Sequence, residues 1–344
     1  MKITFLGSGG GRFATISQKR MTGGFRIDDF GGKNYQVDPG PGALVRSYQF
    51  GVNPTKIDGI FISHSHTDHY NDAEILIEAM TRGMTKNNGI IMGSKTIFEN
   101  YQRWGPALSN YHKSNSKNLI LVPNKIVRFP SFTIKGTDTQ HGDPTAVGFQ
   151  IENNGFKISY TADTGYFDEL AKYHKNADIL IGSVLRPGVR SIKGHMCTNN
   201  FIDLVEKVKP SLAIMTHFGF KMIAANPVEE AIRVSKKTGV RTLAAFDGMR
   251  VDINEKYPER SKMIRLKDRF ANRIKQEEVY SLNFESKPNK NKYHNKNYNK
   301  NNSNYKNNSN YNNSNYKNNS NYNNSNYKNN SYNDSNSKDN LSNL

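Results

Sequence analysis

The chain has 344 residues, a formal net charge of +18 and a single cysteine, Cys197. Intrachain disulfides are therefore impossible and no apolar run approaches the length of a membrane span, so we expect a cytoplasmic protein without membrane association. Half of the charge falls on residues 1–253, where 31 Lys and Arg stand against 22 Asp and Glu; this diffuse positive field either favours polyanions such as phosphate esters or serves only solubility.

The first half of the chain is rich in predicted strands. A strand over residues 1–6 leads into the loop GSGGG at 7–11, whose spacing fits neither dinucleotide-binding nor P-loop patterns. This loop is either a tight turn or a backbone segment that touches a site. Further strands are predicted at 26–30, 34–38, 59–63, 90–92, 119–122, 125–129 and 131–138, a hairpin at 146–152 and 156–161, and helices at 72–82, where Asp72 is a candidate N-cap, and 94–104.

The second half alternates helix and strand. Its helices are predicted at 166–173, 198–207 and 227–238, and its strands at 177–182, 211–216 and 241–246, the last clear strand. Together the two halves suit two mixed sheets packed on each other, with helices outside.

The end of the chain differs in composition. Residues 254–284 are basic, and the segment 255–278 is either a helix packed by its apolar residues or a nucleic-acid-binding surface. Residues 285–344 are almost entirely Asn, Ser, Tyr and Lys, with the imperfect repeat SNYKNNSNYNN beginning at Ser303, Ser314 and Ser325. Because this tail has no aliphatic residues to bury, we predict disorder, with or without stacking on single-stranded nucleic acid.

One segment, IFISHSHTDH at residues 60–69, carries four ligand-type side chains at the end of a predicted buried strand. Side chains two apart point the same way, so His64, His66 and Asp68 can converge, while His69 faces a neighbouring point. Imidazole and carboxylate are the ligands that borderline divalent metals such as zinc prefer. The segment therefore predicts a site for two adjacent metals.

Other polar residues follow predicted strands in the same way, and such strand ends lie together in open sheets. Asp38 at one strand end either orients a ligand histidine or only turns the chain. The complete set of strand-end residues is Asp38, His64, His141, Asp163 and His217.

The motif HSHTDH, followed by a later His, Asp and His, resembles the metallo-β-lactamase-fold hydrolases over residues 1–253. The resemblance implies a four-layer αββα sandwich and two divalent ions, zinc first, with manganese or iron also suited. It implies one metal held by His64, His66 and His141, a second held by Asp68, His69 and His217, a bridging Asp163, and a supporting Asp38.

The segment GHMC at residues 194–197 further resembles the ribonuclease Z and phosphodiesterase branch. That resemblance implies that His195 handles the phosphate or protonates the leaving group, with Asp68 sharing the proton transfers. Two metals would lower the pKa of a shared water, so that hydroxide attacks phosphorus. The chain departs from ribonuclease Z because the short segment 142–162 leaves no room for the usual tRNA-binding arm.

We therefore expect a metal-dependent hydrolase that cleaves phosphodiester bonds, in RNA or in a nucleotide-like ester. A hydrolase of carboxylic esters, thioesters or lactones is the alternative, followed by a non-catalytic nucleic-acid-binding module. Related hydrolases are often dimers, so a homodimer is one option for the assembly.

Overall fold

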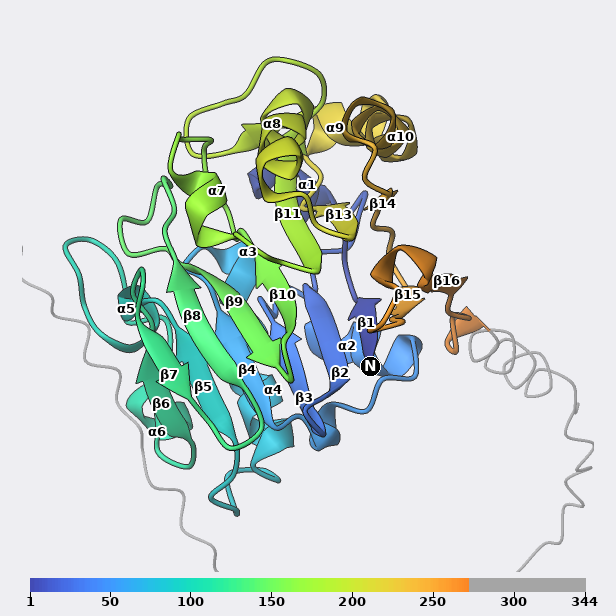
Figure 1. Cartoon of the computed structure of the whole chain (residues 1–344). Helices are drawn as coiled ribbons and strands as arrows, with labels where there is room; N and C mark the ends of the chain where they lie inside the picture. Colours follow the sequence, from blue (N-terminus) through green and yellow to red (C-terminus); the bar gives the residue numbers. More distant parts are fainter. Residues whose placement is uncertain (272–344) are drawn as a thin grey trace, which may run out of the picture. The chain divides into compact units, whose positions relative to one another are not determined.

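The computed structural model describes residues 1–271, which form two facing β-sheets with helices on their outer sides (Figure 1). The remaining residues, with the predicted low-complexity tail and the end of the predicted C-terminal helix, lie outside the described part. No helix within residues 1–271 combines the length and apolar character that crossing a bilayer requires.

The first sheet is antiparallel at one end and parallel at the other. Strands β1 to β3 pair antiparallel, whereas β3 to β6 pair parallel. In sheet order the strands are β16 (Lys262–Arg265), β15 (Met249–Asp252), β1 (Lys2–Phe5), β2 (Phe25–Phe30), β3 (Lys33–Val37), β4 (Gly59–Ile62), β5 (Ile90–Gly93) and β6 (Lys117–Ile120).

The second sheet is antiparallel from residues 126–128 through the predicted hairpin and parallel from the second strand of the hairpin onward. In the hairpin, Ile151 lies opposite Ile158, which confirms the predicted pairing. In sheet order the strands are β14 (Thr242–Ala244), β13 (Leu212–Thr216), β11 (Ile179–Arg186), β10 (Phe156–Tyr160), β9 (Gly148–Asn153), β8 (Thr133–Thr137) and β7 (Ile126–Arg128), and the short β12 (Met196–Cys197) pairs with β11.

Alternation along β4 explains the layers on the side of the first sheet. Phe61 points between the sheets, where its ring centroid lies 4.6 Å from that of Phe149. Ile60 and Ile62 point outward into a separate apolar cluster. Helix α4 (Ala73–Met80) contributes Leu76 and three further buried side chains to that cluster. A strand with both faces covered is apolar throughout, as the sequence of β4 is.

Helices α8 (Thr198–Val208) and α10 (Pro227–Thr238) cover the second sheet, and their buried apolar side chains join the cluster that contains β11. The predicted four-layer αββα sandwich is thus confirmed. The remaining helices are short: α1 (Arg12–Ser17), α2 (Ala43–Gln49), α3 (Thr67–Tyr70), α5 (Lys95–Phe98), α6 (Asn110–Lys113), α7 (Leu170–Tyr173) and α9 (Phe220–Ala224), with 3-10 turns at Pro54–Lys56 and Pro258–Arg260.

The helix predicted over 94–104 is wrong beyond its first turn. Only α5 forms, and Glu99 already has an extended backbone. Thr96, Ile97 and Phe98 are buried, but most of the following side chains are exposed, so a second turn would bury nothing. The chain instead makes a small bridge between Tyr101 and Trp104.

The helix predicted over 255–278 is also wrong in its described part. Strand β16 pairs antiparallel with β15 and extends the first sheet beyond residue 253. Two strands therefore follow residues 241–246, so the prediction that these residues form the last clear strand is wrong. The apolar spacing in this segment suggested a helix with one buried face. In the structure Met263 is half-exposed on an edge strand, and an edge strand leaves apolar side chains in contact with water as a surface helix does.

Candidate metal centre

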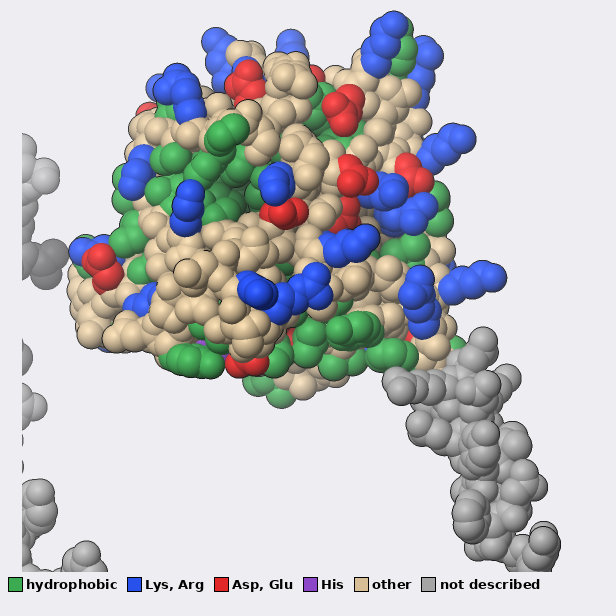
Figure 2. Space-filling view, turned by 90° about the horizontal axis from the view of Figure 1, so that it is seen from below, with side chains coloured by type: hydrophobic (Ala, Val, Ile, Leu, Met, Phe, Trp, Pro, Cys, Tyr) green, Lys and Arg blue, Asp and Glu red, His purple; other side chains and the backbone are tan. Residues whose placement is uncertain are grey.

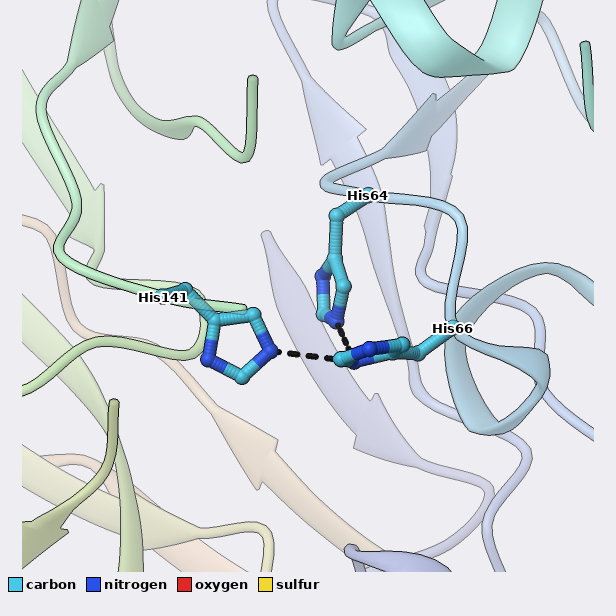
Figure 3. A group of neighbouring side chains, drawn as sticks. All are labelled: His64, His66 and His141. Carbon is cyan, nitrogen blue, oxygen red and sulfur yellow. Dashed lines mark hydrogen bonds between the residues drawn. The ribbon is translucent and has the colours of Figure 1, made fainter. Parts of the chain in front are cut away.

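Three of the predicted histidines meet between the two sheets. His64 and His66 follow β4 of the first sheet, whereas His141 lies in the loop between β8 and β9 of the second (Figure 3). The Nε2 atoms of His64 and His141 lie 2.9 and 3.0 Å from Nδ1 of His66. Sequence proximity thus accounts for two of these histidines, and sheet packing supplies the third.

A second group lies beside the first. His69 Nε2 is 3.2 Å from His217 Nε2, which is itself 3.2 Å from Asp68 Oδ2. Asp163 Oδ2 lies 3.1 Å from His217 Nε2, 3.4 Å from His69 Nε2 and 4.0 Å from His141 Nε2. Asp163 therefore faces both groups, and the structure brings together all seven side chains that the sequence predicted as metal ligands.

Hydrogen bonds on the outer side of the rings determine which nitrogens keep a lone pair. His141 Nδ1 donates to the Gly194 carbonyl at 2.9 Å, and His69 Nδ1 donates to Asp38 at 2.9 Å. Ser63 Oγ donates to Asp38 and therefore accepts from His64 Nδ1. These three histidines thus carry a proton on Nδ1 and direct their Nε2 atoms into the centre.

The converging lone pairs fit divalent cations. His66 Nδ1 can donate to only one of its two acceptor neighbours, so without a cation at least one of the two Nε2 lone pairs has no donor. Asp163 Oδ1 and His217 Nδ1 are buried without a hydrogen-bond partner. Within each of four overlapping triads the ligand atoms lie within 4.8 Å of one another. Imidazole nitrogen and carboxylate oxygen together suit zinc, manganese or iron.

The electrostatics of the cluster also favour a cation. Burial lowers the pKa of His66 to about 4, which keeps the ring neutral at neutral pH. Burial by itself would raise the pKa of Asp163, but His217 and His69 hold it well below the usual range. Burial would lower the pKa of His69, yet Asp163, Asp68 and Asp38 raise it well above its ordinary value. The carboxylates thus retain a proton on His69 where a metal would compete for the same atom.

Asp38 orients two of the histidines, which is the first of the two roles predicted for it. Its Oδ1 accepts from the Ser63 backbone N–H at 2.7 Å, and its Oδ2 accepts from Ser63 Oγ, His69 Nδ1 and Tyr160 OH at 2.8–2.9 Å. All four partners are donors, so the carboxylate holds His69 directly and His64 through Ser63.

Three of the strand ends at the centre have left-handed backbones. The φ angles are 45° at Asp38, 53° at Ala162 and 62° at His217. Non-glycine residues rarely adopt this conformation, and such positions concentrate at functional sites. Here the sharp turns direct Asp38, Asp163 and His217 from their strands towards one point.

The glycine-rich loop at 7–11 contacts the centre and is more than a tight turn. The Gly11 N–H donates to Asp68 Oδ2 at 2.9 Å. A Cβ on Gly10 would lie 2.0 Å from Cδ2 of His217, so only glycine fits there. Asp247 holds the start of the loop through the backbone N–H of Ser8 at 2.9 Å.

Sequence reasoning missed Asp143. This buried carboxylate accepts from Ser65 N at 3.1 Å, from Ser65 Oγ at 2.9 Å and from Thr96 Oγ1 at 2.5 Å. It thereby positions the residue between His64 and His66. Its place two residues after His141 is a signal that could have found it.

His195 lies at the edge of the centre, with Nδ1 3.6 Å from Asp163 Oδ2. Burial lowers its pKa to about 4. The ring also lines an adjoining cavity of about 460 Å³. On another side of the centre, the ring of Trp104 lies 5.2 Å from that of His66. His195 is thus the predicted site residue that faces both the ligand cluster and open space.

Comparison with known proteins identifies the family. Residues 33–218 match the family described as Beta-lactamase superfamily domain. The chain is 42% identical over 261 residues to the uncharacterized protein MJ1374 of Methanocaldococcus jannaschii, covering 75% of this chain and 97% of that one. It is 23% identical over 296 residues to ribonuclease Z of Thermococcus kodakarensis, covering 72% and 93%.

A solved structure extends the likeness to the fold. The metallo-beta-lactamase fold protein YhfI from Bacillus subtilis superposes with a TM-score of 0.59 at 23% identity, covering 72% of this chain and 98% of that chain. The chain belongs to the beta-lactamase superfamily of metal-dependent hydrolases and has the metallo-β-lactamase fold.

Proposed function

We propose that this protein is a dinuclear metal-dependent phosphodiesterase. His64, His66 and His141 would hold one divalent ion, and Asp68, His69 and His217 the other, with Asp163 shared between them. The convergence of these side chains supports the assignment, and zinc is the metal their nitrogen-rich set suits best. When bound, two such ions supply Lewis acidity, which acidifies a water and neutralises charge on a phosphoryl group.

The position of His195 is the observation that carries the choice of phosphodiesters. Its imidazole stands between Asp163 and the cavity, where a group leaving the phosphorus would lie. A neutral imidazole there would donate a hydrogen bond to a phosphate oxygen, and the imidazolium formed when it takes up a proton beside the anionic substrate would pass that proton to the departing oxygen. Asp68, held in place by the Gly11 N–H, is the carboxylate that takes up the proton of the attacking water.

The surface charge supports an anionic substrate. Three cationic side chains, Arg12, Arg186 and Lys221, line the cavity, and no acidic residue does. On the face drawn in Figure 2, other Lys and Arg side chains protrude at many separate points and do not form one stripe. The local cations would therefore bind the phosphate, and the diffuse field would draw anions towards the protein.

Metal content and phosphodiester cleavage test the proposal together. The purified full chain is expected to contain about two metal ions and to hydrolyse bis(p-nitrophenyl) phosphate, with activity lost on chelation and restored by zinc. A folded protein that takes up no metal would refute the metal centre. A protein with two metals and no cleavage would refute the phosphodiesterase assignment alone.

The apolar part of the cavity favours a second candidate, hydrolysis of a carboxylic ester or thioester. Phe13, Leu185, Ile192 and Phe220 contribute apolar lining that an acyl chain would also suit. Such a reaction needs no proton donor at His195. Full p-nitrophenyl acetate hydrolysis by a His195→Ala variant, without any phosphodiesterase activity in the wild type, would favour this candidate.

A further inference from the structure

The cavity beside the metal centre contains a feature that hydrolysis alone does not require. It is lined by two kinds of side chain, aromatic or aliphatic on one hand and cationic on the other. We propose that this cavity binds the nucleobase of a nucleoside phosphodiester, and that Phe13 and Phe220 are the residues that select it. The proposal rests on the phosphodiesterase function and names its substrate class.

The side chains of Phe13 and Phe220 are exposed although burying them would stabilise the fold. Helix α1 has six residues and buries only Ala14, so Phe13 remains 73% exposed. Its ring lies near that of Phe220 at the start of α9, with centroids 6.4 Å apart and planes within 27°. Exposed apolar side chains that gather beside a cavity often mark a binding site, whereas single exposed apolar side chains scattered over a surface are ordinary. Two nearly parallel rings offer a flat ligand a stacking surface.

The cavity that the two phenylalanines line also adjoins the metal centre. The inner wall is formed by Gly10, Gly11 and His195. Gly11 is bonded to Asp68, and His195 lies beside Asp163, so this wall is the boundary of the metal centre. A substrate whose phosphorus reaches that centre would extend its next group along the wall towards the two phenylalanines.

Charge distinguishes a nucleotide from an uncharged aromatic or aliphatic ligand. Arg12, Arg186 and Lys221 line the same cavity, and within residues 1–271 none of them forms an ion pair. Lys19 adds a fourth positive charge 5.2 Å above the Phe220 ring. A ligand that carries both a flat ring and a phosphate satisfies the two kinds of lining at once. The volume, about 460 Å³, is in the range of small-ligand sites and suits one nucleotide unit.

Two phosphodiesters that share the same leaving group, p-nitrophenolate, test the proposal on the full-length, metal-loaded protein. Thymidine 5′-(p-nitrophenyl phosphate) and methyl p-nitrophenyl phosphate differ in the nucleoside alone. We expect kcat/KM at least about tenfold higher for the thymidine ester, since stacking on aromatic side chains contributes at this level. Phe13→Ala and Phe220→Ala should each reduce that ratio, and the double variant should remove it. Tyr111→Ala, at an aromatic side chain 61% exposed outside the cavity, should leave the ratio unchanged.

Binding provides a readout that does not depend on turnover. Calorimetry on the metal-loaded protein should show thymidine 5′-monophosphate, which has no phosphodiester bond to cleave, binding at least about tenfold more tightly than inorganic phosphate, with the difference lost in Phe13→Ala. Equal binding of the two ligands, or cleavage of both esters at equal efficiency, would overturn the nucleobase site and leave the phosphodiesterase intact. Cleavage of neither ester by the metal-loaded protein would instead refute the proposed function itself.

Discussion

Replacing Asp38 by Asn tests whether the support beneath His69 and His64 matters as the geometry indicates. The carboxylate accepts four hydrogen bonds, one at Oδ1 and three at Oδ2, and every partner is a donor. An asparagine amide can place its oxygen at Oδ2 and keep three of them. Its NH₂ group then faces the Ser63 N–H, so two donors oppose each other in a buried position.

The expected magnitude follows from these contacts. One lost hydrogen bond and one unsatisfied buried donor cost about 1–3 kcal/mol of folding stability. The loss of negative charge behind His69 also weakens its Nε2 as a ligand. Substituting residues that hold ligand histidines typically lowers metal affinity about 10- to 100-fold. We expect zinc affinity to fall within this range.

Competition with a chromophoric chelator measures the zinc affinity, and urea unfolding followed by the fluorescence of Trp104, the single tryptophan, measures stability. Tyr160→Phe is the matched control, because it removes one of the four donors and leaves the carboxylate. It should cost about 1 kcal/mol and change zinc affinity by less than about twofold. Asp38→Asn with wild-type zinc affinity would refute the reasoning.

Three other variants follow from particular contacts. His195→Ala should lower kcat for cleavage of a dinucleotide, whose alkoxide leaving group needs a proton, about 10²- to 10⁴-fold with both metals retained, and unchanged kcat would exclude the proton-transfer role. Gly10→Ala should abolish metal uptake, because its Cβ would lie 2.0 Å from the His217 ring, whereas Gly142→Ala, with its nearest contact at 3.6 Å, should bind metal normally. Burial lowers the pKa of His174 to about 3, so the unfolded chain takes up a proton that the folded state resists. Stability should therefore fall as the pH drops from about 6.5 towards 3, by about 2 kcal/mol between pH 7 and pH 5 for this residue. Urea unfolding at each pH should show a shallower fall in His174→Gln, and equal slopes would contradict the assignment.

The sequence alone was enough to predict much of the fold. Apolar runs such as β4 and the alternation in β9 and β10 are local, because burial on one or both faces is recorded in consecutive residues. The sequence also marked the candidate ligands, since polar residues that follow buried strands stand out against them. The two wrong helices, at 94–104 and 255–278, show the limit of this reasoning. Whether a short apolar pattern becomes a turn or an edge strand depends on what it packs against.

Only the tertiary structure decided how these residues meet. No local pattern shows that His141 reaches His66 from the opposite sheet, or that Asp163 faces both groups of ligands. The same holds for Asp143 beneath Ser65, because its role exists only through contacts with residues far away in the chain. The cavity beside His195 is the clearest case. It is formed by the glycine-rich loop, the end of β11 and the start of α9, whose juxtaposition follows from sheet packing.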